Sequence, residues 1–315
     1  MILITGATGF VGRHVVRAFA SGGHQVRCLV HTPSRSQVVM GSGVETLQGD
    51  IMAPSSLTRA LEGVDGVVHL AAVIREQGPL TFQRVNHQGT RDLIFAAKEA
   101  RVERVVHVSA IGTSENPGIP YLQSRWLGEQ EVVGSDLPYN ILRFSVGFGE
   151  GDEFINVLAA LVKSSPLVPV VGDGKSKFQP IAVEDAAKCV VKAYEDQDVL
   201  GKTLELGGPE QITYEGIIDL IGETLGKRVI KIHVPLSVMR PVAGVMDTLL
   251  PRPPVTPEML KMLQVGNVAQ PDSVERAFGF KPRPLKGNID YIKRISFLDA
   301  LKINLGLMPN HIRDH

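Results

Sequence analysis

Three glycines spaced three residues apart stand between a short apolar run and a longer helical segment at the start of the chain. Ile2–Thr5 predicts a buried strand because it is short and apolar, and Phe10–Ala20 predicts a helix because its apolar residues recur at helical spacing. Glycines in such a turn let the backbone approach a pyrophosphate, whose charge then lies on the free amides of the helix N-terminus. The motif therefore predicts a dinucleotide-binding loop made of Gly6, Thr8, Gly9, Phe10, Val11 and Gly12.

The same alternation of strand and helix continues through the first half of the chain. Further strands are predicted at 26–30, 67–70, 104–108 and 140–143, and further helices at 57–61, 80–100 and 121–133. Such alternation predicts an α/β fold with a doubly wound, Rossmann-type parallel sheet. Glycine and proline clusters break the pattern after about residue 145. We therefore expect a dinucleotide-binding core at 1–145 and a smaller mixed substrate lobe at 146–315, interleaved with the core.

Charge and cysteine content argue against several classes of protein. The 33 basic and 33 acidic residues cancel, so the composition offers no net attraction to nucleic acid. Cys28 and Cys189 lie far apart, which predicts neither a disulfide framework nor a zinc site. His69 and His107 fall in predicted strands, where we expect buried rings with satisfied nitrogens and no metal. The start of the chain shows no secretory signal and the apolar stretch 229–250 is interrupted by charges, so a cytoplasmic protein without a spanning helix is expected.

The end of the second predicted strand bears on the choice of dinucleotide. An NAD site normally places an acid about 20 residues beyond the glycines, to hold the ribose 2′-hydroxyl. The segment 26–35 contains no acid and offers donors and a cation instead, which suit a 2′-phosphate and favour NADP(H), with NAD as the weaker alternative. The residues concerned are His31, Thr32, Ser34 and Arg35, together with Arg13 in the first helical turn. The alternative is that both arginines are ordinary surface charges.

Several short motifs in order resemble the extended and atypical short-chain dehydrogenase/reductases. They are TGATGFVG at 5–12, GD at 49–50, HLAA at 69–72, VN at 85–86, VHVSA at 106–110 and PIAVED at 180–185. Within that group the chain is most similar to the branch of the NADPH-binding accessory subunit of respiratory complex I. The resemblance implies that Asp50 and Ile51 face the adenine, that Ala71, Ala72 and Val73 line the cofactor, and that Asn86 steadies the central helix.

The resemblance also implies a catalytic set, with one departure. Family reductases use a serine, a tyrosine and a lysine four residues after the tyrosine, and the matching positions hold Ser109, Tyr121 and Arg125. All three would also contact the cofactor. A cation beside the phenol lowers its pKa from about 10 towards a useful range, and Arg125 supplies one. A guanidinium does not copy the ribose contacts of a lysine, however, so catalysis is expected to be slow or lost.

The end of the chain carries an apolar repeat of its own. Apolar residues recur at spacings of three and four from Leu285 to Leu305, which predicts an amphipathic helix across 285–307. An apolar stripe of this kind docks either on its own core or on a protein partner or membrane surface, the last of which would make the protein peripheral to a membrane complex.

Three functions remain open from the sequence. The first is an NADP-dependent oxidoreductase acting on a small carbonyl or enone. The second is a non-catalytic NADPH-binding subunit that stabilises a larger assembly or senses its redox state. The third is a sugar-nucleotide epimerase or dehydratase, which ranks last because that class prefers NAD and an intact tyrosine and lysine pair.

Overall fold

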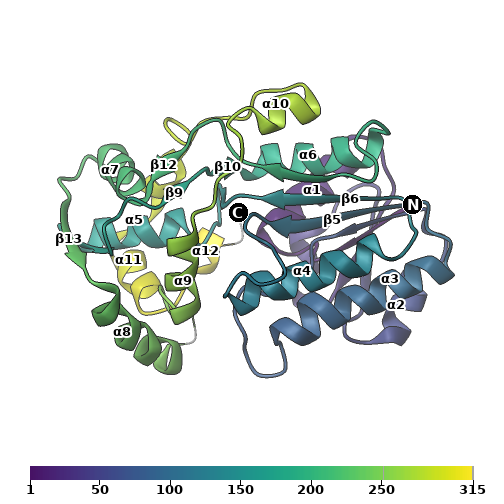
Figure 1. Cartoon of the computed structure of the whole chain (residues 1–315), viewed down its shortest axis with the longest axis horizontal. Helices are drawn as coiled ribbons and strands as arrows, with labels where there is room; N and C mark the ends of the chain where they lie inside the picture. Colours follow the sequence, from purple (N-terminus) through teal and green to yellow (C-terminus); the bar gives the residue numbers. More distant parts are fainter. Residues whose placement is uncertain (251, 314–315) are drawn as a thin grey trace. The chain divides into compact units, whose positions relative to one another are not determined.

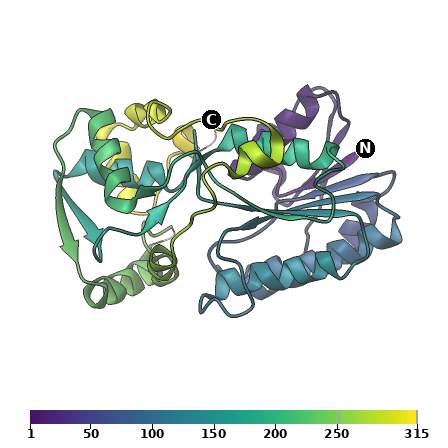
Figure 2. The ribbon, with the colours of Figure 1, turned by 45° about the horizontal axis from the view of Figure 1, so that its top comes forward.

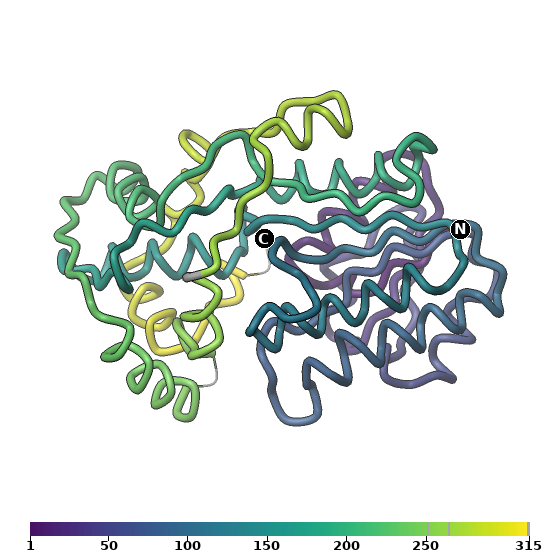
Figure 3. The backbone as a smooth tube through the Cα atoms, viewed as in Figure 1, coloured from purple at the N-terminus to yellow at the C-terminus, as the bar shows by residue number. Residues whose placement is uncertain are grey.

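The computed structural model describes residues 1–250 and 252–313, which divide into two compact units. The first unit comprises Met1–Phe144, Val183–Leu206 and Ser273–Phe280. The second comprises Ser145–Ala182, Gly207–Asp272 and Lys281–His315. Each unit is thus drawn from three separate stretches of chain, and the tube in Figure 3 follows the chain through them.

A seven-stranded parallel sheet forms the centre of the first unit. Its order is β11-β6-β5-β4-β1-β2-β3, and every neighbouring pair runs parallel. The strands are β1 (Ile2–Thr5), β2 (Val26–Val30), β3 (Val44–Gln48), β4 (Gly66–His69), β5 (Arg104–Ala110), β6 (Tyr139–Phe144) and β11 (Thr203–Leu206). The order reverses between β1 and β4, and ligands of such sheets bind beyond the carboxyl ends of the strands at this point.

Helices cover both faces of the sheet, as Figures 1 and 2 show. On one face α1 packs against α6, and on the other α3 packs against α2 and α4. The helices are α1 (Phe10–Ser21), α2 (Pro54–Ala60), α3 (Thr90–Glu99), α4 (Pro120–Val133), α6 (Val183–Glu195) and α10 (Ser273–Phe278), with a 3-10 helix η1 (Pro33–Val39) and a π-helix η2 (Phe82–Gly89). The prediction of a Rossmann-type, doubly wound α/β fold is confirmed.

Local chemistry explains where these elements begin and end. Both β1 and β2 have the predicted bounds, because each is a short apolar run closed by polar or glycine residues. Pro54 and Pro120 each occupy the first turn of a helix, where a missing amide proton leaves no hydrogen bond unmade. The predicted helix 80–100 begins later, at Phe82, and its first turns are π-helical.

The second unit is a mixed assembly of short strands and helices. Its strands pair two by two: β7 (Gly147–Phe148) with β10 (Ile181–Ala182), β9 (Lys177–Phe178) with β12 (Ile212–Thr213), and β8 (Leu167–Val171) with β13 (Ile230–Val234). Its helices are α5 (Ile155–Ser164), α7 (Tyr214–Leu225), α8 (Leu236–Leu249), α9 (Pro257–Val265), α11 (Phe297–Asn304) and α12 (Asn310–Arg313), with a 3-10 helix η3 (Asp290–Arg294). Within the described residues, no helix is both long and apolar enough to cross a membrane.

The prediction of one amphipathic helix across 285–307 is wrong. Gly287 has a φ of +81°, a left-handed conformation that interrupts a right-handed helix. A new helix then starts at Phe297, because the Ser296 side chain accepts from the amide of Asp299 while the Asp299 carboxylate accepts from the amide of Ser296. The apolar stripe divides in consequence. Its first half is buried in the core of the second unit, and its second half, Leu298, Leu301 and Leu305, is exposed.

The division of the apolar stripe into a buried and an exposed half predicts that matched substitutions in the two halves change the melting temperature by different amounts. Ile292 is fully buried in the second unit, whereas Leu298 is 68% exposed. Ile292→Ala should lower the melting temperature of the intact protein by roughly 5–15 °C, because truncating a buried isoleucine costs about 2–5 kcal/mol. Leu298→Ala should change it by no more than about 2 °C. Equal shifts in calorimetric scans of the two variants would contradict the division.

Candidate dinucleotide-binding and catalytic site

The glycine loop joins β1 to α1 at the carboxyl edge of the sheet. Gly6 has a φ of +71° and lies so close to the next loop that a Cβ there would stand 2.6 Å from the amide nitrogen of Ala71. At Gly12 a Cβ would stand 2.1 Å from the Gly6 carbonyl oxygen. At Gly9 it would meet only that same oxygen, at 3.2 Å, so the loop is open on this side.

The first turn of α1 supplies the donors that such a loop needs. Gly9 is the N-cap residue and has no side chain with which to satisfy the helix amides. The free amides and the positive end of the helix dipole therefore remain for an anionic group. Close packing at Gly6 and Gly12 with an open side at Gly9 fits a bound pyrophosphate. Among the other predicted loop residues, Thr8, Phe10 and Val11 are each partly exposed.

The predicted 2′-phosphate residues fall into two environments. His31, Thr32 and Ser34 are exposed where β2 ends, and Arg35 is partly buried in η1. Arg13 is only 4% exposed, with its guanidinium 5.8 Å from the Phe10 ring centre. Burial excludes the alternative that Arg13 is an ordinary solvated charge.

An acid does reach the end of β2, from a neighbouring strand. Asp50 follows β3, and its Oδ2 lies 3.4 Å from Nε2 of His31. Its Oδ1 accepts a hydrogen bond from the Met52 amide at 2.9 Å. A search for an acid within residues 26–35 did not find this carboxylate, because only the pairing of β2 with β3 brings Asp50 close to the end of β2. Ile51, the other residue implied to face the adenine, is buried against Gly89.

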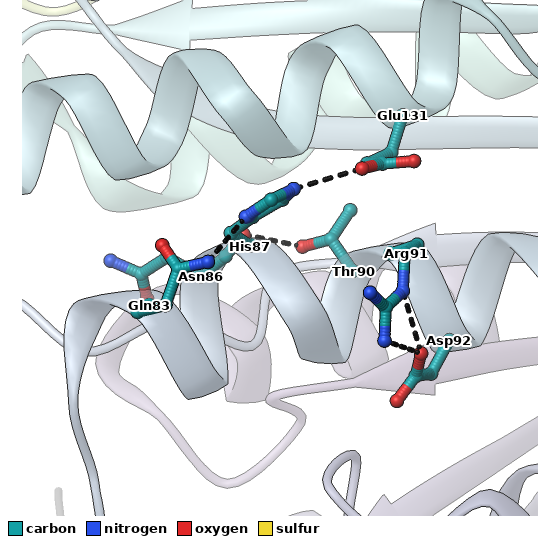
Figure 4. Close-up of polar contacts among 7 residues, drawn as sticks. All are labelled: Gln83, Asn86, His87, Thr90, Arg91, Asp92 and Glu131. Carbon is teal, nitrogen blue, oxygen red and sulfur yellow. Dashed lines mark hydrogen bonds and ion pairs between the residues drawn. The ribbon is translucent and has the colours of Figure 1, made fainter.

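Asn86 connects the loop after β4 to helix α4. Its Oδ1 accepts from the Val73 amide at 2.8 Å, and its Nδ2 donates to the Val73 carbonyl and to Ser124 Oγ on α4. Its own carbonyl accepts from Thr90 Oγ1 at 2.7 Å, as Figure 4 shows. This buried amide thus holds the segment of Ala71, Ala72 and Val73 against η2 and α4.

The two strand histidines differ from one another. His69 has both nitrogens satisfied, at 2.7 Å from Thr5 Oγ1 and 2.9 Å from Thr90 Oγ1, as expected. The expectation for His107 is wrong, because neither of its ring nitrogens has a partner among the described residues. Burial, followed by the Arg125 charge, lowers the pKa of His69 to about 3 and that of His107 well below its usual value. Both rings are therefore neutral at physiological pH.

Thr5, Thr90 and Ser124 were not singled out by the sequence. Together with Asn86 and His69 they form one buried hydrogen-bonded chain from the end of β1 to α4. Figure 4 also shows a second link to α4, in which His87 Nε2 lies 2.8 Å from Glu131 Oε1. For Thr5 the available signal was a polar residue at the end of an otherwise apolar strand, which does not indicate its partner, and Thr90 and Ser124 lie on helices without a comparable signal.

The predicted catalytic residues lie on β5 and α4 of the first unit. Ser109 is buried near the end of β5, and Tyr121 and Arg125 are one turn apart on α4. Arg125 Nη2 donates to the carbonyl oxygen of Val108, the neighbour of Ser109. The Tyr121 ring packs edge-on against Phe82, with 5.8 Å between ring centres.

Several polar atoms of this set are buried and unsatisfied. Within the described residues, Ser109 Oγ and both Nε and Nη1 of Arg125 lack a hydrogen-bond partner. Burial lowers the pKa of Arg125, and the nearby Tyr121 and Glu129 partly offset this effect. Buried donors without partners are uncommon in folded proteins, and they fit a site completed by the hydroxyl and carbonyl groups of a bound cofactor and substrate.

Burial and a neighbouring charge shift the pKa of the Tyr121 phenol in opposite directions. Burial raises the pKa of Tyr121, and the Arg125 charge lowers it. Glu129, one turn beyond Arg125, is held by Arg143, whose Nη2 lies 2.6 Å from Glu129 Oε2. Arg125 is therefore the group that favours phenolate here, and the residues present can hold or release a proton at the Tyr121 oxygen.

The profile of one family matches most of this first unit, across residues 2–207. That match covers more than half of the chain. The chain belongs to the NAD dependent epimerase/dehydratase family. The resemblance to extended short-chain dehydrogenase/reductases is confirmed.

Three relatives illustrate the range of the family. NADH dehydrogenase (ubiquinone) 1 alpha subcomplex subunit 9 from mitochondria of Arabidopsis thaliana is 26% identical over 300 residues, 90% of this chain and 75% of the relative. The ceramide reductase of Caulobacter vibrioides is 35% identical over 191 residues, 61% of this chain and 60% of the relative. The photosystem II assembly factor Ycf39 of Synechocystis is 30% identical over 242 residues, 76% of this chain and 72% of the relative.

A solved structure extends the likeness of fold to nearly the whole chain. The NADPH-dependent quinone oxidoreductase QOR2 of Escherichia coli, solved with NADPH, matches with a TM-score of 0.75 at 21% identity. The match covers 93% of this chain and 99% of that structure.

Proposed function

We propose that this chain is an NADP(H)-dependent oxidoreductase that reduces a small carbonyl or enone compound, with Tyr121 as the proton donor. The observation that carries the proposal is the set of Ser109, Tyr121 and Arg125 at one end of β5 and α4, with unsatisfied buried donors on Ser109 and Arg125. Donors held in place in this way stabilise negative charge that develops on a carbonyl oxygen.

A nicotinamide dinucleotide is supported by the glycine loop and by the family. The dinucleotide supplies the hydride when bound. The residues that would hold it are the loop Gly6–Gly12, the segment Ala71–Val73, and Ser109, Tyr121 and Arg125. NADP(H) is favoured over NAD(H) because Asp50, the acid near the adenosine end, is already engaged by His31 and the Met52 amide. The buried Arg13 and the donors after β2 then suit a 2′-phosphate.

Arg35→Ala tests the choice of cofactor. A charge-assisted contact contributes roughly 1.5–3 kcal/mol, so this variant should bind NADPH about tenfold or more weakly and bind NADH nearly as before. Arg17→Ala, an exposed arginine on the same α1 that bears Arg13, is the matched control and should change neither affinity. The measurement is calorimetric titration with both cofactors. Equal affinities of the unmutated protein for NADPH and NADH would contradict the proposal.

A second candidate is a non-catalytic NADPH-binding subunit of a larger assembly. Arg125 favours it, because a guanidinium neither relays a proton nor copies the contacts of a lysine. Two of the three relatives also bear the names of a complex subunit and of an assembly factor. The ceramide reductase favours the enzyme. Epimerase or dehydratase chemistry remains third, since the lysine that this class pairs with the tyrosine is absent.

One experiment separates the first two candidates. NADPH oxidation by the purified protein is followed against a panel of small carbonyls, enones and quinones, and NADPH binding is measured in parallel. Turnover with any compound supports the oxidoreductase. Tight NADPH binding without turnover across the panel would favour the subunit.

A further inference from the structure

The exposed side of α11 is apolar, although the helix already packs on the second unit through its opposite side. Ala300 and Ile303 are buried in the core of that unit, where α11 packs against α5. On the outer side Phe297, Leu298, Leu301 and Leu305 are 41–68% exposed, and Lys302 lies among them. We call these five residues the α11 face. Exposed apolar side chains gathered on one helix face indicate an interaction surface.

A cluster of cations lies at the last turn of α5, which contacts the end of α11. Lys163 Nζ donates to the Lys293 carbonyl at 3.2 Å, and Lys227 Nζ donates to the Lys163 carbonyl at 2.7 Å. The next residue, Ser164, accepts from Asn304 of α11 at 2.9 Å. One turn of α5 therefore contacts both the cations and the end of α11, and Figure 1 shows α5 and α11 together in this unit.

Acidic groups do not compensate this cluster fully. Lys293 pairs with Asp290 at 2.9 Å, and Asp299 is buried in the helix cap. Across residues 1–250 and 252–313, Lys227, Arg228 and Lys302 have no acidic partner within 4.0 Å. The Lys227 charge adds to burial in lowering the pKa of Lys163, with Asp299 opposing them. The surface therefore combines leucine and phenylalanine side chains with unpaired positive charge.

We propose that the α11 face, with Lys163, Lys227, Arg228 and Lys293 beside it, binds an anionic lipid membrane surface. Apolar side chains of a surface helix enter the boundary between headgroups and acyl chains, and flanking lysines and arginines are attracted to anionic headgroups. Pairing with a second copy of the chain is disfavoured, because a two-fold contact through this face would bring the cation clusters together. The binding is peripheral, and it is independent of the proposed reaction.

Vesicle flotation of the intact chain 1–315 tests the proposal. The protein should float with vesicles of phosphatidylcholine mixed with phosphatidylglycerol, float weakly with phosphatidylcholine alone, and be released by high salt. Lys302→Ala should weaken binding about fivefold, which corresponds to about 1 kcal/mol for one cation at an anionic surface. The double variant Leu298→Asp/Leu301→Asp should weaken it more than tenfold.

Matched variants guard against unfolding and non-specific charge effects. Phe95→Asp changes a residue of α3 that is 68% exposed, the same fraction as Leu298, and should leave flotation unchanged. NADPH affinity and melting temperature should be unaltered in every variant, because all the substituted side chains are exposed.

Several outcomes would overturn the proposal. They are the absence of flotation with anionic vesicles at low salt, or equal flotation of the Leu298→Asp/Leu301→Asp protein and its parent. A concentration-dependent dimer in sedimentation that the double variant abolishes, with no vesicle binding, would assign the face to a second copy. A protein that stays monomeric and does not float would also overturn the lipid assignment.

Discussion

Tyr121→Phe is expected to lower NADPH-dependent turnover by about 10²–10⁴-fold, the usual contribution of a positioned proton donor. The loss should fall on kcat, with NADPH affinity nearly unchanged, because the hydroxyl acts mainly in the transition state. The phenylalanine keeps the edge-on contact with Phe82, so the fold should remain intact. Tyr194→Phe on α6, at the opposite face of the sheet, is the matched control and should retain turnover. The measurement is steady-state kinetics with the compound that gives the highest rate.

Arg125 variants refine this first expectation. Arg125→Lys should raise turnover, since a compact ammonium is able to contact ribose hydroxyls and still favour phenolate. Arg125→Met removes the charge that lowers the pKa of Tyr121, so the pKa of the phenol should rise and the pH-rate profile should move to higher pH. A profile that does not move, with turnover equal in both variants, would mean that Arg125 is structural only.

Gly12→Ala is expected to weaken NADPH binding by about a hundredfold or more. Its Cβ would stand 2.1 Å from the Gly6 carbonyl oxygen and 2.7 Å from that of Ala7. Both obstacles are backbone atoms, so α1 must move away from the loop as a whole. A misplacement of about 1 Å can lower the rate of a positioned reaction on the order of 10²-fold, and we expect a loss of similar size in cofactor affinity here.

A control glycine separates an effect at this turn from a general effect of replacing a glycine by alanine. Gly244 lies in α8, where a Cβ would meet nothing within 4 Å. Gly244→Ala should therefore leave NADPH affinity unchanged and raise helix stability by up to about 1 kcal/mol. Fluorescence titration with NADPH measures both variants. Wild-type affinity in Gly12→Ala would show that the dinucleotide does not lie against this turn.

The parts of the fold that the sequence predicted correctly are those specified within a few residues. The strand at Ile2–Thr5 and the glycine loop are adjacent, so their pattern needs no distant partner. The strand Val44–Gln48 was missed because only two of its five residues, Val44 and Leu47, are apolar, so this edge strand has neither a continuous apolar run nor a strict alternation of polar and apolar residues. The apolar repeat at 285–305 was interpreted as one helix, because the spacing of apolar residues does not reveal the left-handed conformation of Gly287 or the helix N-cap at Ser296.

In the candidate site, too, features that are local in the sequence differ from those that depend on distant contacts. The glycine loop is a local pattern, whereas Tyr121 and Arg125 were proposed from the family resemblance, and the structure places both on α4. The proximity of Asp50 to His31 and the buried chain through Asn86 depend on which strands and helices are neighbours. Sequence spacing carries little information on those contacts, because most of them join residues far apart in the chain: Asp50 and His31 are 19 positions apart, and Asn86 and Ser124 are 38 positions apart.

Helix α6 and strand β11 belong to the first unit but come late in the chain, and this order affects how the unit folds during synthesis. β6 ends at Phe144, and its outer neighbour β11 begins only at Thr203. Translation at about 5–20 residues per second leaves that edge of the sheet unpaired for several seconds, with α1 still lacking its cover α6. The nascent first unit therefore exposes an open strand edge and an apolar helix face while the second unit is only partly made. A ribosome-bound chaperone that shields apolar segments would have its longest opportunity to bind during that interval.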